Sequence, residues 1–140
     1  MKLLITGGHL APALALIEEI QKSKKEVDVI FVGRKHPIDK EKTLSLEYKE
    51  IIKKKLTFVS LEAGRLTRII SLSSLIGILK IPIGFLKSFF IINQYRPDII
   101  MSFGGYLALP LVFWGYIFRI PIFTHEQTIK PGLANKLISK

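Results

Sequence analysis

The sequence of 140 residues contains no cysteine, which excludes disulfide bonds and metal sites built from thiolates. This absence suits a protein of a reducing, cytosolic compartment. Other metal-binding patterns are missing too, because the chain has no Asp-x-Asp pair and no His-x-x-x-His spacing. We therefore expect neither a catalytic metal ion nor another cofactor.

Acidic residues are scarce: 11 Asp and Glu stand against 21 Lys and Arg, which gives a net charge of +10. An excess of this size predicts an anionic partner, either a phosphorylated substrate, an acidic membrane surface or nucleic acid. Nucleic acid is the weakest of the three. The basic runs at 22–25, 34–42 and 49–55 are typical of solvated helix faces and turns, and no recognition-helix, zinc-finger or RNA-binding sheet signature accompanies them.

Uninterrupted apolar runs of the roughly 20 residues that a membrane span requires are also missing. Residues 69–92 and 107–123 approach that length, but charged residues and prolines interrupt both. The apolar stretch before Thr6 is too short for a signal peptide. We expect the two long segments to be buried helices or helices on a membrane surface.

The apolar pattern alternates between short strands and amphipathic helices. The expected strands are 2–5, 27–32, 56–60, 98–102 and 121–124. The expected helices are 12–22, 40–54, 69–95 with a break near Pro82, 107–118 and 131–139. Repeated units of this kind predict an α/β fold: one doubly wound, Rossmann-like parallel sheet over residues 1–140, with helices on both faces.

Polar clusters follow three of the predicted strands. They are Thr6-Gly7-Gly8-His9, 102–106 with its Gly104-Gly105-Tyr106 turn, and His125-Glu126-Gln127-Thr128. Each alone is also explained as a tight strand-to-helix turn. Because parallel strands place their carboxyl ends on one edge of the sheet, the three clusters together predict a shared ligand site.

The first cluster predicts a site for a phosphate-bearing molecule. Glycine lets a ligand approach the backbone, and the helix that follows points its positive dipole end at the loop. A dinucleotide is disfavoured, since there is no G-x-G-x-x-G and Gly33-Arg34 replaces the acidic residue expected after the second strand. The loop with its neighbouring imidazole therefore favours a diphosphate-linked substrate.

These motifs resemble the N-terminal domain of the MurG-like enzymes of glycosyltransferase family 28. The matching residues are 6–15, Arg96-Pro97-Asp98, Gly104-Gly105-Tyr106, Ile120-Pro121, His125-Glu126-Gln127 and 132–136. The resemblance implies the acceptor-side half of a GT-B enzyme that is inverting and needs no metal. Its reaction would move N-acetylglucosamine, or a related hexosamine, from UDP to a polyprenyl-diphosphate-linked sugar in peptidoglycan synthesis.

The resemblance also assigns roles to residues. His9 is the candidate general base, or else a helix-start imidazole that only hydrogen-bonds a carbonyl; Glu126 is the second candidate, or else orients His125 or pairs with a lysine. Thr6, Gly7, Gly8, Gly104, Gly105, Tyr106, His125, Gln127, Thr128 and Asn135 are the expected substrate-binding residues. Tyr106 and Asn135 are also explained as helix-capping and helix-face residues. Two departures stand out: the glycine loop is about three residues shorter than in the family, and Thr128 replaces its asparagine.

A basic, apolar segment over 65–87 predicts contact with an anionic leaflet, the alternative being a core helix with basic ends. The expected contact residues are Arg65, Arg68, Ile69, Leu72, Leu75, Ile76, Lys80 and Lys87. Such contact would place the protein peripherally on the cytoplasmic face of the cell membrane.

Three functions are compatible with this sequence. The first is the acceptor-binding half of a glycosyltransferase, inactive without a C-terminal half that binds most of the UDP-sugar. The second is a non-catalytic, membrane-docking subunit of a split transferase that recruits a separate donor-binding chain. The third is a Rossmann-like nucleotide or phosphate binder.

Overall fold

A computed structural model describes residues 1–23, 25–37, 43–63 and 72–126, with the side chains of 72–80 excepted. The strands are β1 (Lys2–Thr6), β2 (Asp28–Gly33), β3 (Thr57–Ser60), β4 (Ile99–Ser102) and β5 (Ile122–Thr124). The helices are α1 (Leu10–Lys22), α2 (Leu46–Lys53), α3 (Leu72–Tyr95) and α4 (Ala108–Ile117). All strand pairs are parallel, in the order β3-β2-β1-β4-β5, which confirms the predicted doubly wound sheet.

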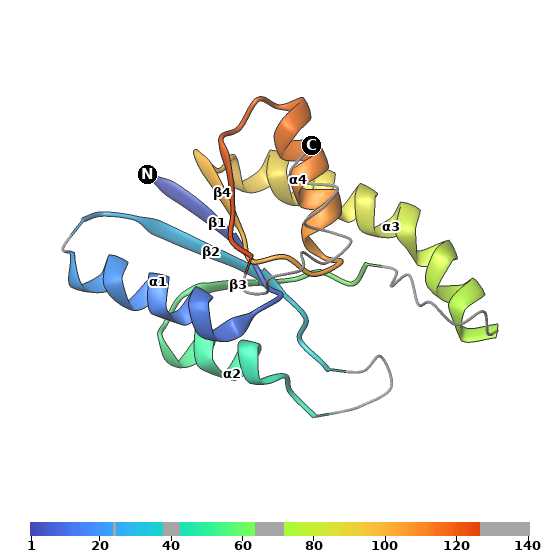
Figure 1. Cartoon of the computed structure of the whole chain (residues 1–140), viewed down its shortest axis with the longest axis horizontal. Coiled ribbons are helices and arrows are strands. Elements are labelled where there is room, and N and C mark those ends of the chain that lie inside the picture. Colours follow the sequence, from blue (N-terminus) through green and yellow to red (C-terminus); the bar gives the residue numbers. More distant parts are fainter. Residues whose placement is uncertain (24, 38–42, 64–71, 127–140) are drawn as a thin grey trace.

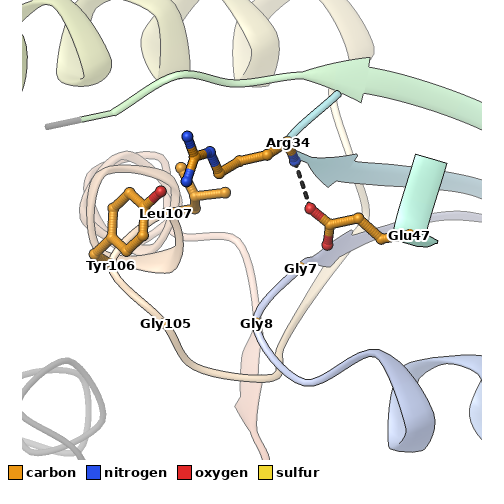
Figure 2. A pocket seen from close by; sticks show the side chains of 7 residues that line it. All are labelled: Gly7, Gly8, Arg34, Glu47, Gly105, Tyr106 and Leu107. Atoms are coloured by element: carbon orange, nitrogen blue, oxygen red, sulfur yellow. Dashed lines mark hydrogen bonds between the residues drawn. The ribbon is translucent and has the colours of Figure 1, made fainter. Parts of the chain in front are cut away.

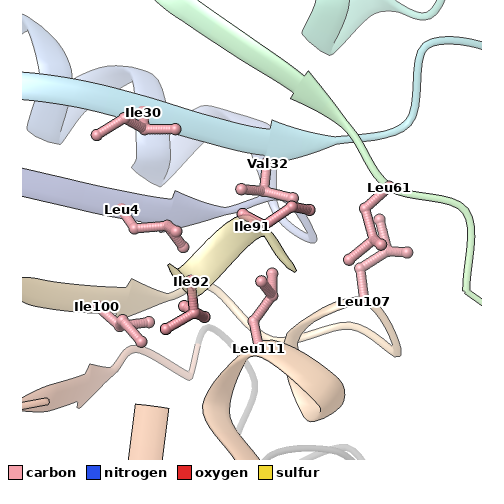
Figure 3. Close-up of a cluster of buried hydrophobic side chains, with 9 residues drawn as sticks. All are labelled: Leu4, Ile30, Val32, Leu61, Ile91, Ile92, Ile100, Leu107 and Leu111. Atoms are coloured by element: carbon pink, nitrogen blue, oxygen red, sulfur yellow. The ribbon is translucent and has the colours of Figure 1, made fainter. Parts of the chain in front are cut away.

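Helices cover both faces of this sheet: α1 and α2 lie on one face, α3 and α4 on the other (Figure 1). Alternate residues of β1 divide between two cores, since Leu3 and Ile5 pack on the α1 side and Leu4 on the α3–α4 side. Figure 3 shows the second core, made by Leu4, Ile30, Val32, Leu61, Ile91, Ile92, Ile100, Leu107 and Leu111. Burial on both faces explains why β1 and β2 are almost entirely apolar.

Asp98 aligns the two central strands. Its carboxylate accepts a hydrogen bond from the backbone N–H of Lys2 at 2.7 Å, and its own N–H donates to the Lys2 carbonyl at 2.9 Å. The resulting register pairs Thr6 with Ser102, which are the last residues of β1 and β4 at the carboxyl edge of the sheet. The loops that leave these two strands therefore start side by side.

The predicted helix over 40–54 is too long at its N-terminal end. α2 begins at Leu46 because Ser45 caps it: the Ser45 hydroxyl accepts from the Tyr48 N–H at 3.2 Å and donates to the Arg34 carbonyl. The second bond ties the start of α2 to the residue that follows β2. This cap therefore fixes where the first turn of α2 lies relative to the sheet edge.

The break predicted near Pro82 is wrong, because α3 continues through this proline. Pro82 is exposed, and as a proline it removes one backbone hydrogen-bond donor from a helix of 24 residues. Beyond it, rings hold α3 against α4: the Phe89 and Trp114 centroids lie 5.0 Å apart, and Trp114 Nε1 donates to the Phe85 carbonyl at 2.7 Å. The predicted helix 131–139 lies outside the described residues.

Substitution of Ser45 by alanine should lower the free energy of unfolding by about 1–2 kcal/mol, because it removes the N-cap of α2 and its bond to the sheet edge. Ser23→Ala is the matched control. Its hydroxyl bonds only to the Ile20 carbonyl at the exposed end of α1, so its loss should stay within about 0.5 kcal/mol. Urea unfolding compares the two, and equal losses would show that the cap does not fix α2.

Candidate functional site

The two glycine loops meet backbone to backbone at the carboxyl edge of the sheet. A Cβ on Gly8 would lie 2.5 Å from the carbonyl oxygen of Gly104 and 2.8 Å from that of Phe103. Gly104 and Gly105 have φ values of 79° and 76°, in the region that favours glycine. A side chain at Gly8 would therefore push the loops apart.

A pocket of about 300 Å³ opens beside this contact (Figure 2). Its lining residues are Gly7, Gly8, Arg34, Glu47, Gly105, Tyr106 and Leu107. They come from three places: the β1–α1 loop, the β4–α4 turn, and the end of β2 together with the first turn of α2. Leu107 also belongs to the buried core on the α3–α4 side, so this wall of the pocket is continuous with the core.

Two charged residues line the pocket: Arg34, which follows β2, and Glu47 in the first turn of α2. The Arg34 backbone N–H donates to Glu47 Oε1 at 2.7 Å. The Arg34 side chain extends away from Glu47 toward the ring of Tyr106 (Figure 2). Glu47 lies close beneath the first loop, since a Cβ on Gly7 would be 2.7 Å from Glu47 Oε2. A cation and an anion thus line one pocket on either side of the Arg34 backbone.

Glu47 is half-buried, and this burial raises the pKa of its carboxyl above the usual range. The hydrogen bond from the Arg34 N–H and the positive charge of Arg34 act in the opposite direction. The ionised carboxylate is therefore held in a place that penalises its charge. Such a cost is common where a side chain serves a site.

Sequence reasoning missed both of these residues. It placed Arg34 in a solvated turn, which is wrong, because the residue is half-buried and lines the pocket. Glu47 was not singled out at all. The sequence did contain one signal for Glu47. Ser45 is a typical N-cap residue, and an acidic residue two positions later is typical of the first turn of a helix, so a helix start after β2 could have been placed here.

The structure brings most of the predicted first and second clusters together. Gly7, Gly8, Gly105 and Tyr106 line the pocket, and Gly104 lies against Gly8. Thr6 does not line it. Its side chain is fully buried below the loop, and its hydroxyl has no hydrogen-bond partner among the described residues.

The third cluster begins next to β4. The His125 N–H donates to the Ser102 carbonyl at 2.8 Å, and the His125 ring lies 5.6 Å from that of Phe103. Glu126 is half-buried. The predicted site residues Gln127, Thr128 and Asn135 lie outside the described residues.

His9, the candidate base, is exposed at the N-cap of α1. Its side chain makes no capping hydrogen bond to the described start of α1, and it is not one of the residues that line the pocket. The exposed imidazole ring of His9 is therefore accessible to a substrate that enters from the solvent side. The geometry does not assign it a role.

A family model for the glycosyltransferase family 28 N-terminal domain matches residues 6–140. The chain belongs to glycosyltransferase family 28. Among similar proteins, the UDP-N-acetylglucosamine–N-acetylmuramyl-(pentapeptide) pyrophosphoryl-undecaprenol N-acetylglucosamine transferases of Borrelia hermsii and Treponema denticola are 32% and 34% identical over 96% of this chain. The chain spans about a third of the length of these relatives, 35% and 34%.

Solved structures show the same fold for this family 28 domain. The crystal structure of Acinetobacter baumannii MurG matches 99% of this chain and 38% of its own, with a TM-score of 0.70 and 23% identity. UDP-GlcNAc 2-epimerase from Neisseria meningitidis, solved with UDP-GlcNAc bound, matches 89% of this chain and 32% of its own, with a TM-score of 0.54 and 12% identity. At these identities the likeness concerns the fold alone.

Exposed apolar side chains occur on α3 and at α4, on one face of the sheet of this family 28 domain. This exposed apolar surface consists of Ile83, Leu86, Phe90, Phe113, Tyr116, Ile117 and Phe118. Of the predicted membrane-contact residues, Lys87 is exposed within it. Arg65, Arg68 and Ile69 lie outside the described residues, as do the side chains of Leu72, Leu75, Ile76 and Lys80. No helix in the described parts of the chain is long and apolar enough to cross a bilayer.

The raised pKa of Glu47 has a consequence for stability. A folded-state pKa above the unfolded one means that the ionised carboxylate destabilises the fold above that pKa, and that this cost disappears as the pH falls through it. Glu47→Gln keeps an acceptor for the Arg34 N–H and removes the charge. We expect this variant to be more stable than the wild type at neutral pH and equally stable in acid.

Glu18→Gln provides a control of opposite sign. The hydrogen bond and charge of Lys54, 2.8 Å away, lower the pKa of Glu18, so its ionised form stabilises the fold at neutral pH and this gain is lost in acid. Glu18→Gln should therefore be slightly less stable than the wild type at neutral pH. Urea unfolding across the acid range tests both, and a neutral-pH loss in Glu47→Gln would contradict the burial argument.

Proposed function

We propose that this domain is the acceptor-binding half of a glycosyltransferase and that its pocket receives the diphosphate of a polyprenyl-diphosphate-linked sugar. The observation that carries this proposal is the glycine-walled pocket at the carboxyl edge of the sheet, between the starts of α1 and α4. Backbone without side chains admits a phosphate closely, and helix starts favour negative charge. The relatives from Borrelia hermsii and Treponema denticola are named for a pyrophosphoryl-undecaprenol acceptor.

The reaction we propose is transfer of N-acetylglucosamine, or a related hexosamine, from UDP with inversion at the sugar and without a metal. The acceptor hydroxyl must lose a proton, and the departing diphosphate must be stabilised. We assign the proton acceptor to His9, at the exposed start of α1, with Glu126 as the second candidate. Tyr106 and His125 would contact the acceptor from the β4 side.

The donor would be held mostly by a second domain, so that this domain alone would be inactive. The relatives are about three times as long as this chain, which leaves ample length for such a domain. The exposed apolar surface also supports a second candidate function, a non-catalytic docking subunit of a split transferase that recruits a separate donor-binding chain. Transfer activity in a longer or complemented protein separates the two.

A transfer assay with and without a complementing C-terminal half tests the proposed reaction. We expect activity only in the complemented protein, and a loss of about 10²–10⁴-fold in turnover for His9→Ala if His9 is the general base. His36→Ala is the matched control, because His36 contacts the Thr43 carbonyl in a turn outside the pocket. A loss below tenfold would remove His9 from this role, and no activity in the complemented wild type would favour the docking subunit.

We further propose that the protein rests peripherally on the cytoplasmic face of the cell membrane through the exposed apolar surface. A polyprenyl acceptor stays in the bilayer, so the domain that binds its diphosphate must approach the lipid headgroups. Leu86 and Phe90, each 58% exposed, flank Lys87 on α3. Apolar side chains beside a cation favour an anionic leaflet.

Sedimentation with vesicles that contain anionic lipid tests this contact. The double variant Leu86→Ser/Phe90→Ser should lose most of the binding, because it removes buried apolar area in the lipid interface. Ile52→Ser is the control, since Ile52 is 47% exposed on α2, across the sheet from α3 (Figure 1). Equal binding by both variants, or no binding by the wild type at low salt, would contradict the proposal.

A further inference from the structure

We propose that Arg34 is the phosphate-contacting cation of the pocket and that Glu47 positions it. This inference rests on the proposed function, because it names the residue that would contact the diphosphate and the residue that would position it. Neither residue belongs to the glycine loops. Arg34 directly follows β2 and Glu47 lies in the first turn of α2, and both line the pocket.

The position of Arg34 supports this role. Arg34 directly follows the last residue of β2, at the edge where parallel sheets hold their ligands. Its side chain extends across the pocket toward Tyr106, so that a guanidinium and a phenol face the glycine backbone (Figure 2). A planar guanidinium presents two parallel N–H donors to one phosphate, a fixed geometry that the ammonium group of lysine lacks. Among the described residues that line the pocket, Arg34 is the cation.

Glu47 acts on the other side of the same backbone. Its carboxylate holds the Arg34 N–H at 2.7 Å, while the Ser45 hydroxyl donates to the Arg34 carbonyl. The N-cap of α2 and a residue of its first turn thereby hold both backbone polar groups of Arg34. This anchoring leaves the guanidinium, and not the backbone, as the group that turns toward the pocket. We therefore assign Glu47 a positioning role, which it exerts through Arg34.

The charge on Glu47 argues against a direct role with phosphate. A carboxylate repels a diphosphate, and burial already penalises this one. We therefore place the anionic end of a ligand between Arg34, Tyr106 and the contact of Gly8 with Gly105, and not beside Gly7, which adjoins Glu47. The sugar hydroxyls of the same ligand could face the carboxylate, which accepts hydrogen bonds.

Binding of geranyl diphosphate to the 140-residue chain, measured by titration calorimetry, tests the role of Arg34. Arg34→Gln should weaken binding by about 10–100-fold, and Arg34→Lys by less, because the charge remains while the fork is lost. Lys35→Gln is the matched control, because it removes a positive charge from the next residue, whose exposed side chain lies over the Tyr48 ring. It should weaken binding by less than about threefold. Equal effects of Arg34→Gln and Lys35→Gln would overturn the inference.

A double-variant cycle tests whether Glu47 acts through Arg34. Glu47→Leu removes the acceptor and should lose affinity, whereas Glu47→Gln, which keeps it, should stay within about threefold of the wild type. Arg34→Gln/Glu47→Leu should bind no more weakly than Arg34→Gln alone, since the two residues act through one contact. Additive losses would remove the positioning role. Absence of any binding by the wild-type chain would instead contradict the proposed function itself, and the inference with it.

Discussion

The close backbone contact between the two glycine loops is the constraint on which the site depends. Gly8 lies so near the carbonyls of Gly104 and Phe103 that a methyl group does not fit between them. The contact follows from the sheet, because the pairing of β1 with β4 places Thr6 opposite Ser102 just before each loop begins. Two loops without side chains can then share one edge and leave an open pocket beside them.

Because glycine backbone forms part of the pocket wall, the chemical character of the pocket comes from the side chains around it. Arg34, Glu47 and Tyr106 provide a cation, an anion and a phenol around about 300 Å³. The short helix α2 has a larger part in this than its length suggests, since its N-cap Ser45 and Glu47 both bind the Arg34 backbone. The ionised Glu47 is costly where it lies, and we interpret this cost as the consequence of fixing Arg34.

The sequence predicted the fold well, because apolar strands buried on both faces and glycine turns are local signals. The meeting of the 6–9 and 102–106 clusters followed from the rule that parallel strands end on one edge. Arg34 and Glu47 could not be predicted in the same way. They are 13 residues apart, and only the cap at Ser45, which shortens the expected helix, brings Glu47 back to Arg34. Likewise, Pro82 predicted a break, but α3 continues through it and packs against α4 beyond it.

The central claim, that the joined glycine loops form the diphosphate pocket, is tested most directly by mapping backbone amide shifts in the ¹⁵N-labelled chain as inorganic pyrophosphate is added. We predict the largest shifts at Gly8, Gly105 and Tyr106, and smaller ones along α3 and α4. Shifts concentrated instead on the exposed lysines of residues 49–55, with the glycine loops unchanged, would contradict it.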